Sequence, residues 1–279
     1  MAIDFCLSTG NLETAEHMLS ELGDLGSRFL EPDMGYLVDL LGFRAMYKRK
    51  KHYELKNLLV DKLKHLLELG YCKRSYFELL ALLLDVYVEL NDFTQVSNLV
   101  DNNLQTAVQY NLETYYYLLK VYELRVYTET GNLDKAESIY KDTKLGVNKM
   151  ERKVQALFYY NVALLFIKLY TKDGRDGYKP AQGIGKDMQN NLRAASDCAL
   201  EILDLELLNK VAFSFAVVSD IANEPANAEL WAKKHLQVEH VCSFVEKNYK
   251  PSDLDRAGIS GTMSFFGRVY SALKDVINK

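Results

Sequence analysis

Histidines are the residues of this sequence best suited to acid–base or metal chemistry, and there are five of them. None belongs to the HExxH arrangement of a catalytic zinc site, and His235 and His240 are five residues apart, which places their rings on different parts of a helix. The segment 180–187 has a proline where a phosphate-binding loop needs its first glycine, and Asp187 where it needs serine or threonine. We therefore expect no catalytic site, no metal and no cofactor, and we predict that the chain is not an enzyme.

Polar side chains that interrupt apolar stretches suggest a different chemistry, the binding of a peptide. Arg125 and Lys168 carry the charge needed to hold carboxylates. The Asn161 amide both donates and accepts hydrogen bonds, as recognition of an extended backbone requires. The alternative for Asn161 is that its side chain bonds to its own helix.

A block of positive charge lies at Lys48, Arg49, Lys50 and Lys51. Residues 1–39 contain eight acidic side chains and one basic, whereas residues 40–75 contain ten basic and three acidic. The block has the loose pattern of a nuclear-import signal or a nucleic-acid patch. The alternative is a solvated turn that faces an acidic neighbouring repeat. The net charge of −4 disfavours nucleic-acid binding by the whole chain.

The composition predicts which elements position these side chains. The chain has 279 residues, 48% of them hydrophobic, with only 4 prolines and 15 glycines, which favours long helices and disfavours turn-rich β-structures. We find no signal peptide and expect no membrane-spanning run, so an intracellular, cytoplasmic protein is predicted, or a nuclear one if the basic block is an import signal. The four cysteines have no paired spacing and are expected to be reduced and mostly buried.

An internal repeat of about 40 residues organises the sequence. The segment from Thr9 to Glu16 recurs 121 residues later, from Thr130 to Glu137, which corresponds to about three periods. Similar residues stand 40 apart in the columns Tyr47, Tyr87, Tyr127 and Leu59, Leu99, Ile139. Breaks fall at Gly10, Lys51, Asn91 and Gly131, between a first and a second helix of each unit. The columns predict Tyr87 and Tyr127 as core residues.

The fourth unit, with Tyr127, Gly131, Ala136 and Tyr140, resembles the tetratricopeptide repeat. The resemblance implies an all-α fold, a right-handed superhelical solenoid of about six antiparallel helix pairs with a C-terminal capping helix, in a single domain over residues 1–279. The expected pairs occupy about 1–30, 34–70, 74–108, 112–146, 150–204 and 205–247, with an insertion at 172–188 and the capping helix at 262–278. By this register the chain begins partway along a helix.

In such repeats the first helix of each pair lines a concave groove that holds a peptide or a partner helix. Counting back three, six, ten and thirteen residues from each turn gives the groove positions, from which the expected site residues are Glu78, Asp85, Arg125, Phe158, Asn161 and Lys168. We predict a non-catalytic protein- or peptide-binding scaffold, with homodimerisation left open. The helix pairs also distantly resemble the peptide-sensing domains of pheromone-receptor transcriptional regulators. One alternative is therefore such a domain without its DNA-binding segment. The other is an enzyme whose site lies under the insertion at 172–188.

Overall fold

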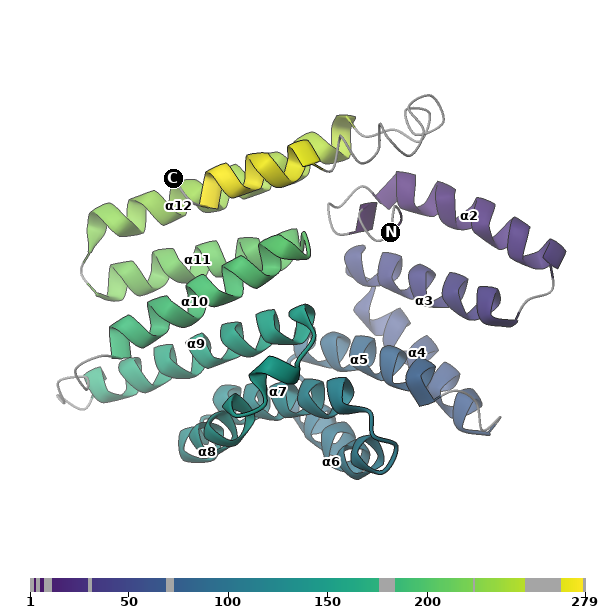
Figure 1. Cartoon of the computed structure of the whole chain (residues 1–279), viewed down its shortest axis with the longest axis horizontal. Helices are drawn as coiled ribbons and strands as arrows, with labels where there is room; N and C mark the ends of the chain where they lie inside the picture. Colours follow the sequence, from purple (N-terminus) through teal and green to yellow (C-terminus); the bar gives the residue numbers. More distant parts are fainter. Residues whose placement is uncertain are drawn as a thin grey trace. The chain divides into compact units, whose positions relative to one another are not determined.

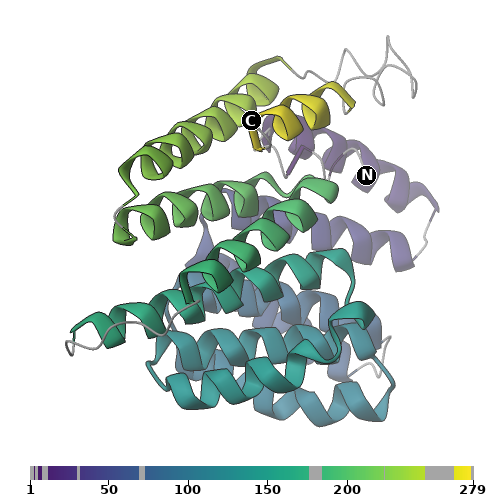
Figure 2. The ribbon, with the colours of Figure 1, turned by 60° about the vertical axis from the view of Figure 1, so that its left-hand side comes forward.

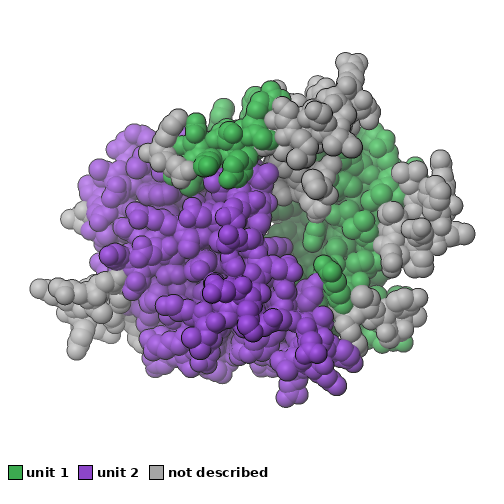
Figure 3. Space-filling model, in the orientation of Figure 1, with its two compact units in different colours: residues 1–91, 239–279 green, residues 92–238 purple. Residues whose placement is uncertain are grey.

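The computed structural model describes residues 3, 6–7, 12–29, 32–68, 73–175, 184–222, 224–248 and 267–277. Within these ranges the chain is all-helical and has no strand, as the composition predicts. Contacts form mainly between helices that follow one another in the sequence, so the predicted arrangement in sequential helix pairs is confirmed. The chain divides into two compact units, which are coloured separately in Figure 3.

Unit 1 comprises residues 1–91 and 239–279. Its helices are α2 (Leu12–Phe29), α3 (Pro32–Lys48), α4 (His52–Glu68) and α5 (Lys73–Glu89). Helix α3 contacts α2, α4 and α5, and α4 also contacts α5. Of the capping helix expected at 262–278, residues 267–277 are helical, with Val269, Leu273 and Ile277 on the buried side. Residues 262–266 and 278 lie outside the described ranges.

Unit 2 comprises residues 92–238. Its elements are α6 (Phe93–Gln109), α7 (Glu113–Glu129), α8 (Leu133–Lys144), the short helix η1 (Val147–Lys149), α9 (Arg152–Arg175), α10 (Ile184–Glu201), α11 (Leu205–Ile221) and the first part of α12 (Pro225–Asn248). Both Figure 1 and Figure 2 show α9, α10, α11 and the first part of α12 side by side in the order in which they occur in the sequence. Helix α7 contacts both α8 and α9, which brings together the first helices of two consecutive pairs.

The turns between paired helices share a backbone arrangement. Asn91 and Gly131, 40 residues apart, both have positive φ, at 56° and 81°. The residue after each one, Asp92 or Asn132, accepts a backbone hydrogen bond at the start of the next helix. In the preceding pair the positive φ of 58° falls on Lys50, one residue before the predicted break at Lys51. The break expected at Gly10 lies outside the described residues.

Helix α9 is apolar on most of its circumference because neighbours surround it. It contacts α7, α8 and α10, and Val162, Ala163 and Leu165 are fully buried along it. By length and composition its residues Arg152–Thr171 pass as a membrane span, which corrects the expectation that no such run exists. Core helices of soluble proteins pass the same test, so the match is weak support for a membrane location.

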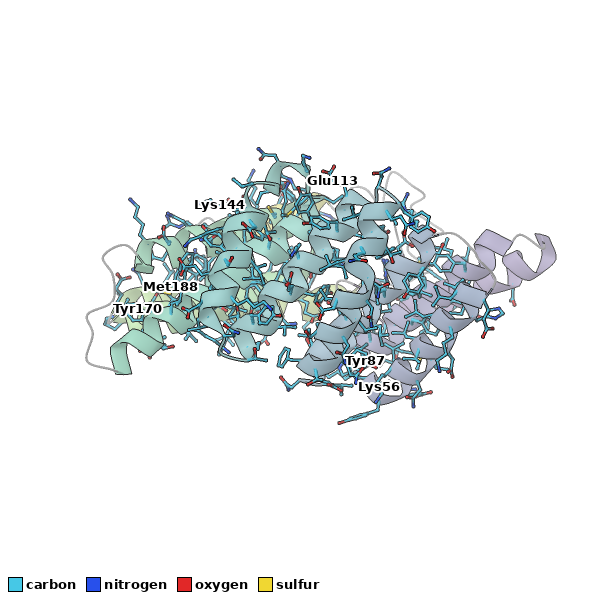
Figure 4. The ribbon with its side chains drawn as sticks, turned by 90° about the horizontal axis from the view of Figure 1, so that it is seen from below. Lys56, Tyr87, Glu113, Lys144, Tyr170 and Met188 are labelled. Carbon is cyan, nitrogen blue, oxygen red and sulfur yellow. The ribbon has the colours of Figure 1, made fainter. Side chains whose placement is uncertain are left out.

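Two large side chains labelled in Figure 4, Tyr87 of α5 and Met188 of α10, are buried. Tyr87 therefore lies in the core, as its column predicts. Tyr127 is only half-buried, and Lys135 of α8 donates a hydrogen bond to its hydroxyl group. The prediction that both tyrosines are core residues is thus confirmed for Tyr87 and wrong for Tyr127.

The insertion expected at 172–188 is shorter in the structure. Helix α9 continues to Arg175 and α10 begins at Ile184, so both ends of the expected insertion are helical. Residues 176–183 lie outside the described ranges.

Candidate functional site

A charged network joins α7 to α9 within unit 2. Oε1 of the Glu129 carboxylate forms an ion pair with Nη2 of Arg125, at 2.8 Å, and Oε2 pairs with Nζ of Lys168. The Nη1 group of Arg125 donates to Oδ1 of Asn161, at 3.3 Å. Two cations therefore share one carboxylate, and a neutral amide completes the set.

The network reaches the surface without being fully solvated. The side chains of Arg125, Glu129 and Lys168 are 22%, 20% and 37% exposed, and Asn161 is 7% exposed. Nε of Arg125 is buried without a hydrogen-bond partner in the described part of the chain. Charges in such a setting interact more strongly than they would in open water.

Asn161 and Lys168 belong to a continuous strip on α9. Leu157, Asn161, Leu164 and Lys168 are spaced by four, three and four residues, which places them on one face of the helix. Leu157, Leu164 and Lys168 are half-buried, whereas Asn161 lies deeper between them. The strip thus alternates apolar and polar side chains at a partly accessible surface.

Phe158 does not share this surface. It is 1% exposed and its ring stacks on that of Tyr140, with the two centroids 6.2 Å apart and the planes at 25°. Leu165, at the next apolar position of the expected groove face, is 0% exposed. Both residues belong to the core, so we do not include Phe158 in the site, and its place on the exposed face is taken by Leu157.

Glu78 and Asp85, the other expected site residues, lie on α5 in unit 1. Glu78 accepts hydrogen bonds from Nε of Arg74, at 3.3 Å, and from the hydroxyl of Tyr36, at 3.1 Å. Asp85 is half-buried one turn before the end of the helix. Their role in ligand binding stays a prediction, separate from the network in unit 2.

The basic block forms the turn between α3 and α4. Nη2 of Arg49 lies 2.6 Å from Oε2 of Glu16 on α2, and Nζ of Lys51 lies 3.9 Å from Oε2 of Glu54. Lys48 ends α3, and Lys50 is exposed in the left-handed conformation. Arg49 therefore pairs with the acidic N-terminal segment, which agrees with the interpretation of this block as a solvated turn.

The two cysteines whose surroundings the structure describes are buried. Cys6 and Cys198 are buried free thiols, and burial raises the pKa of both, that of Cys6 to about 12. A thiol with so high a pKa is almost entirely protonated at neutral pH and is a poor nucleophile. Among the described residues no group of three or more His, Cys, Asp or Glu side chains is arranged to hold a metal ion.

Glu129 is the residue of this network that the sequence interpretation missed. Counting back from Gly131 by three, six, ten and thirteen residues passes over it. A different signal identifies it, because Glu129 is four residues after Arg125 and so lies on the same side of the helix.

A scan of the chain against models of protein families finds none that matches, and comparisons with curated proteins and with solved structures find no significant match. The function is therefore argued from the residues and their arrangement.

Proposed function

We propose that this protein is a non-catalytic binding module that holds an acidic segment of a protein or peptide against the strip on α7 and α9. Arg125 and Lys168 bind the carboxylate of the segment, Asn161 binds its backbone, and Leu157 and Leu164 contact its apolar side chains. The geometry of the helix pairs supports a tetratricopeptide-like solenoid as the scaffold, and we include that architecture in the proposal.

The single observation behind this proposal is the charge imbalance of a partly buried network. Arg125 and Lys168 contribute two positive charges, and Glu129 contributes one negative charge. Because partly buried charges are stabilised chiefly by opposite charges nearby, the excess favours one further anion. An arginine and a lysine from adjacent helices suit a carboxylate, which accepts hydrogen bonds through two oxygens.

The apolar part of the strip favours a peptide over a small anion. Leu157 and Leu164 lie one turn on either side of Asn161, and both are half-buried. Each would bury further apolar surface under a bound chain, which contributes about 25 cal/mol for every Å² removed from water. A free inorganic anion would gain nothing from these leucines.

Selection from a random dodecapeptide library displayed on phage tests the proposal. We expect the wild-type protein to select peptides enriched in Asp and Glu. The double variant Arg125→Gln, Lys168→Gln should bind the selected peptides about 30-fold more weakly or worse, because it leaves their carboxylates without partners. The matched control is Lys50→Gln, Lys64→Gln, which removes two positive charges from exposed positions of unit 1.

Two results would contradict the proposal. One is a selection that yields no binding peptide. The other is a peptide whose affinity falls equally in the control and in the site variant, since that would reflect only the net charge of the protein. Melting temperatures of both double variants should be measured first, so that only folded proteins are compared.

A further inference from the structure

Glu129 occupies the position that a ligand carboxylate needs. Its two oxygens are divided between two cations, Oε1 to Arg125 on its own helix and Oε2 to Lys168 on α9. A carboxylate from a bound peptide would require the same two donors. Building on the proposed function, we infer that Glu129 is an internal competitor that sets the affinity of the site for acidic ligands.

The position of Glu129 within α7 does not by itself favour a glutamate. Glu129 is the last residue of the helix, where the partial negative charge of the helix terminus repels a carboxylate. Its helical partner, Arg125, lies four residues before it, which is the weaker order for such a pair. The pairs Glu137–Lys141, Glu206–Lys210 and Glu229–Lys233 have the stronger order, with the acid first, whereas Arg74–Glu78 on α5 shares the weaker order.

Glu129 is therefore held mainly by the two cations, and a ligand carboxylate that displaced it would give both cations a new partner of the same kind. The exchange keeps two cations paired with one carboxylate, so the net cost of displacing Glu129 is smaller than the cost of breaking the network without a replacement. Removing the carboxylate should then increase the affinity for an acidic ligand. A network away from the binding surface would show no gain beyond that of removing a carboxylate elsewhere on α7.

The matched control lies on the same helix. Glu123 forms an ion pair with Lys120, at 2.7 Å, is 14% exposed, and is not part of the network with Lys168. Glu123→Gln and Glu129→Gln change the net charge of the protein and of α7 equally. Any difference between them in ligand affinity therefore reports on the network and not on overall charge.

The probe is fluorescein-labelled decaglutamate, and its affinity is measured by fluorescence anisotropy at low ionic strength, where charge interactions are least screened. We expect Glu129→Gln to bind it about tenfold more tightly than wild type, and Glu123→Gln to differ from wild type by less than about twofold. Adding Arg125→Gln and Lys168→Gln to Glu129→Gln should abolish the gain. Glu129→Ala removes the same carboxylate and replaces Glu129→Gln if that variant does not fold.

The outcomes separate this inference from the proposed function. If Glu129→Gln does not increase the affinity, but the double variant Arg125→Gln, Lys168→Gln lowers it, Glu129 is not a competitor and the proposed anion site is retained. A gain that survives loss of both cations also disproves the competitor. If none of these variants alters the affinity, or decaglutamate binds to none of them, both the competitor and the proposed site are wrong.

Discussion

The turn at Lys48–Lys51 and the network on α7 and α9 are both rich in positive charge, yet they differ in how the charges are matched. At the turn, Arg49 has one carboxylate partner, Glu16, and the two side chains are 40% and 44% exposed. In the network, Arg125 and Lys168 share a single carboxylate, and Arg125 is about half as exposed as Arg49. The number of partners and the degree of burial therefore distinguish the network, our proposed binding site, from a solvated turn better than the number of basic residues does.

This difference has a thermodynamic reason. Exposed ion pairs are solvated and screened, so they neither gain much by pairing nor lose much when a partner is absent. A partly buried arginine loses water that only another polar group can replace. Arg125 is thus expected to affect both stability and binding, whereas Arg49 is expected to affect neither strongly.

The largest expected effect is on stability, and it tests which side of α9 faces the core. Phe158→Ala should lower the free energy of unfolding by about 3–5 kcal/mol, because it leaves a cavity beside Tyr140. Leu157→Ala, one residue away on the half-buried strip, should cost about 1 kcal/mol. Urea denaturation of both variants measures the difference, and equal losses would show that the register of α9 is wrong.

A smaller effect separates the two arginines. Arg125→Ala leaves Oδ1 of Asn161 and the carboxylate of Glu129 without this donor, and we expect it to destabilise the protein by about 1–3 kcal/mol. Arg49→Ala should cost less than about 1 kcal/mol. Unfolding curves at low salt and in 1 M NaCl provide the measurement. If Arg49→Ala proved the more damaging at both salt concentrations, the distinction between turn and network would be lost.

The smallest effect tests whether the basic turn has a structural role only. Lys50 is exposed and has a φ of 58°, a conformation that glycine adopts without strain. Lys50→Gly should therefore stabilise the protein by about 0.5–1 kcal/mol. Lys56→Gly, in the interior of α4, should instead destabilise it by about 1 kcal/mol. A shift in melting temperature gives the sign of each effect, and a loss of stability in Lys50→Gly would refute the argument.

The sequence predicts the helix pairs well because their signal is repeated. Turn residues such as Asn91 and Gly131 recur at a spacing of 40 and have a local backbone requirement, so they can be recognised one at a time. The side-chain register of α9 is harder to predict. Apolar residues of α9 lie on most sides of the helix. Their periodicity therefore does not distinguish Phe158, which lies in the core, from Leu157, which lies on the strip.

The members of the charged network can be recognised from the sequence only in part. Arg125, Asn161 and Lys168 stand out as polar residues in apolar helices. In the structure Arg125 contacts Asn161, and Glu129 pairs with both Arg125 and Lys168. Their meeting depends on contact between α7 and α9, which residue spacing alone does not determine. Glu129 was missed for the same reason, since its importance comes from a lysine on another helix.

Photo-crosslinking tests the central claim, that acidic peptides bind at the strip on α7 and α9, most directly. Benzoylphenylalanine would replace Leu164, between Asn161 and Lys168 on the strip, or Leu58, a 42% exposed leucine of α4 in unit 1. With an acidic peptide from the phage selection, we predict a crosslink from position 164 that excess unlabelled peptide suppresses, and none from position 58. A crosslink from position 58 with none from position 164 would contradict the claim and move the binding surface to unit 1.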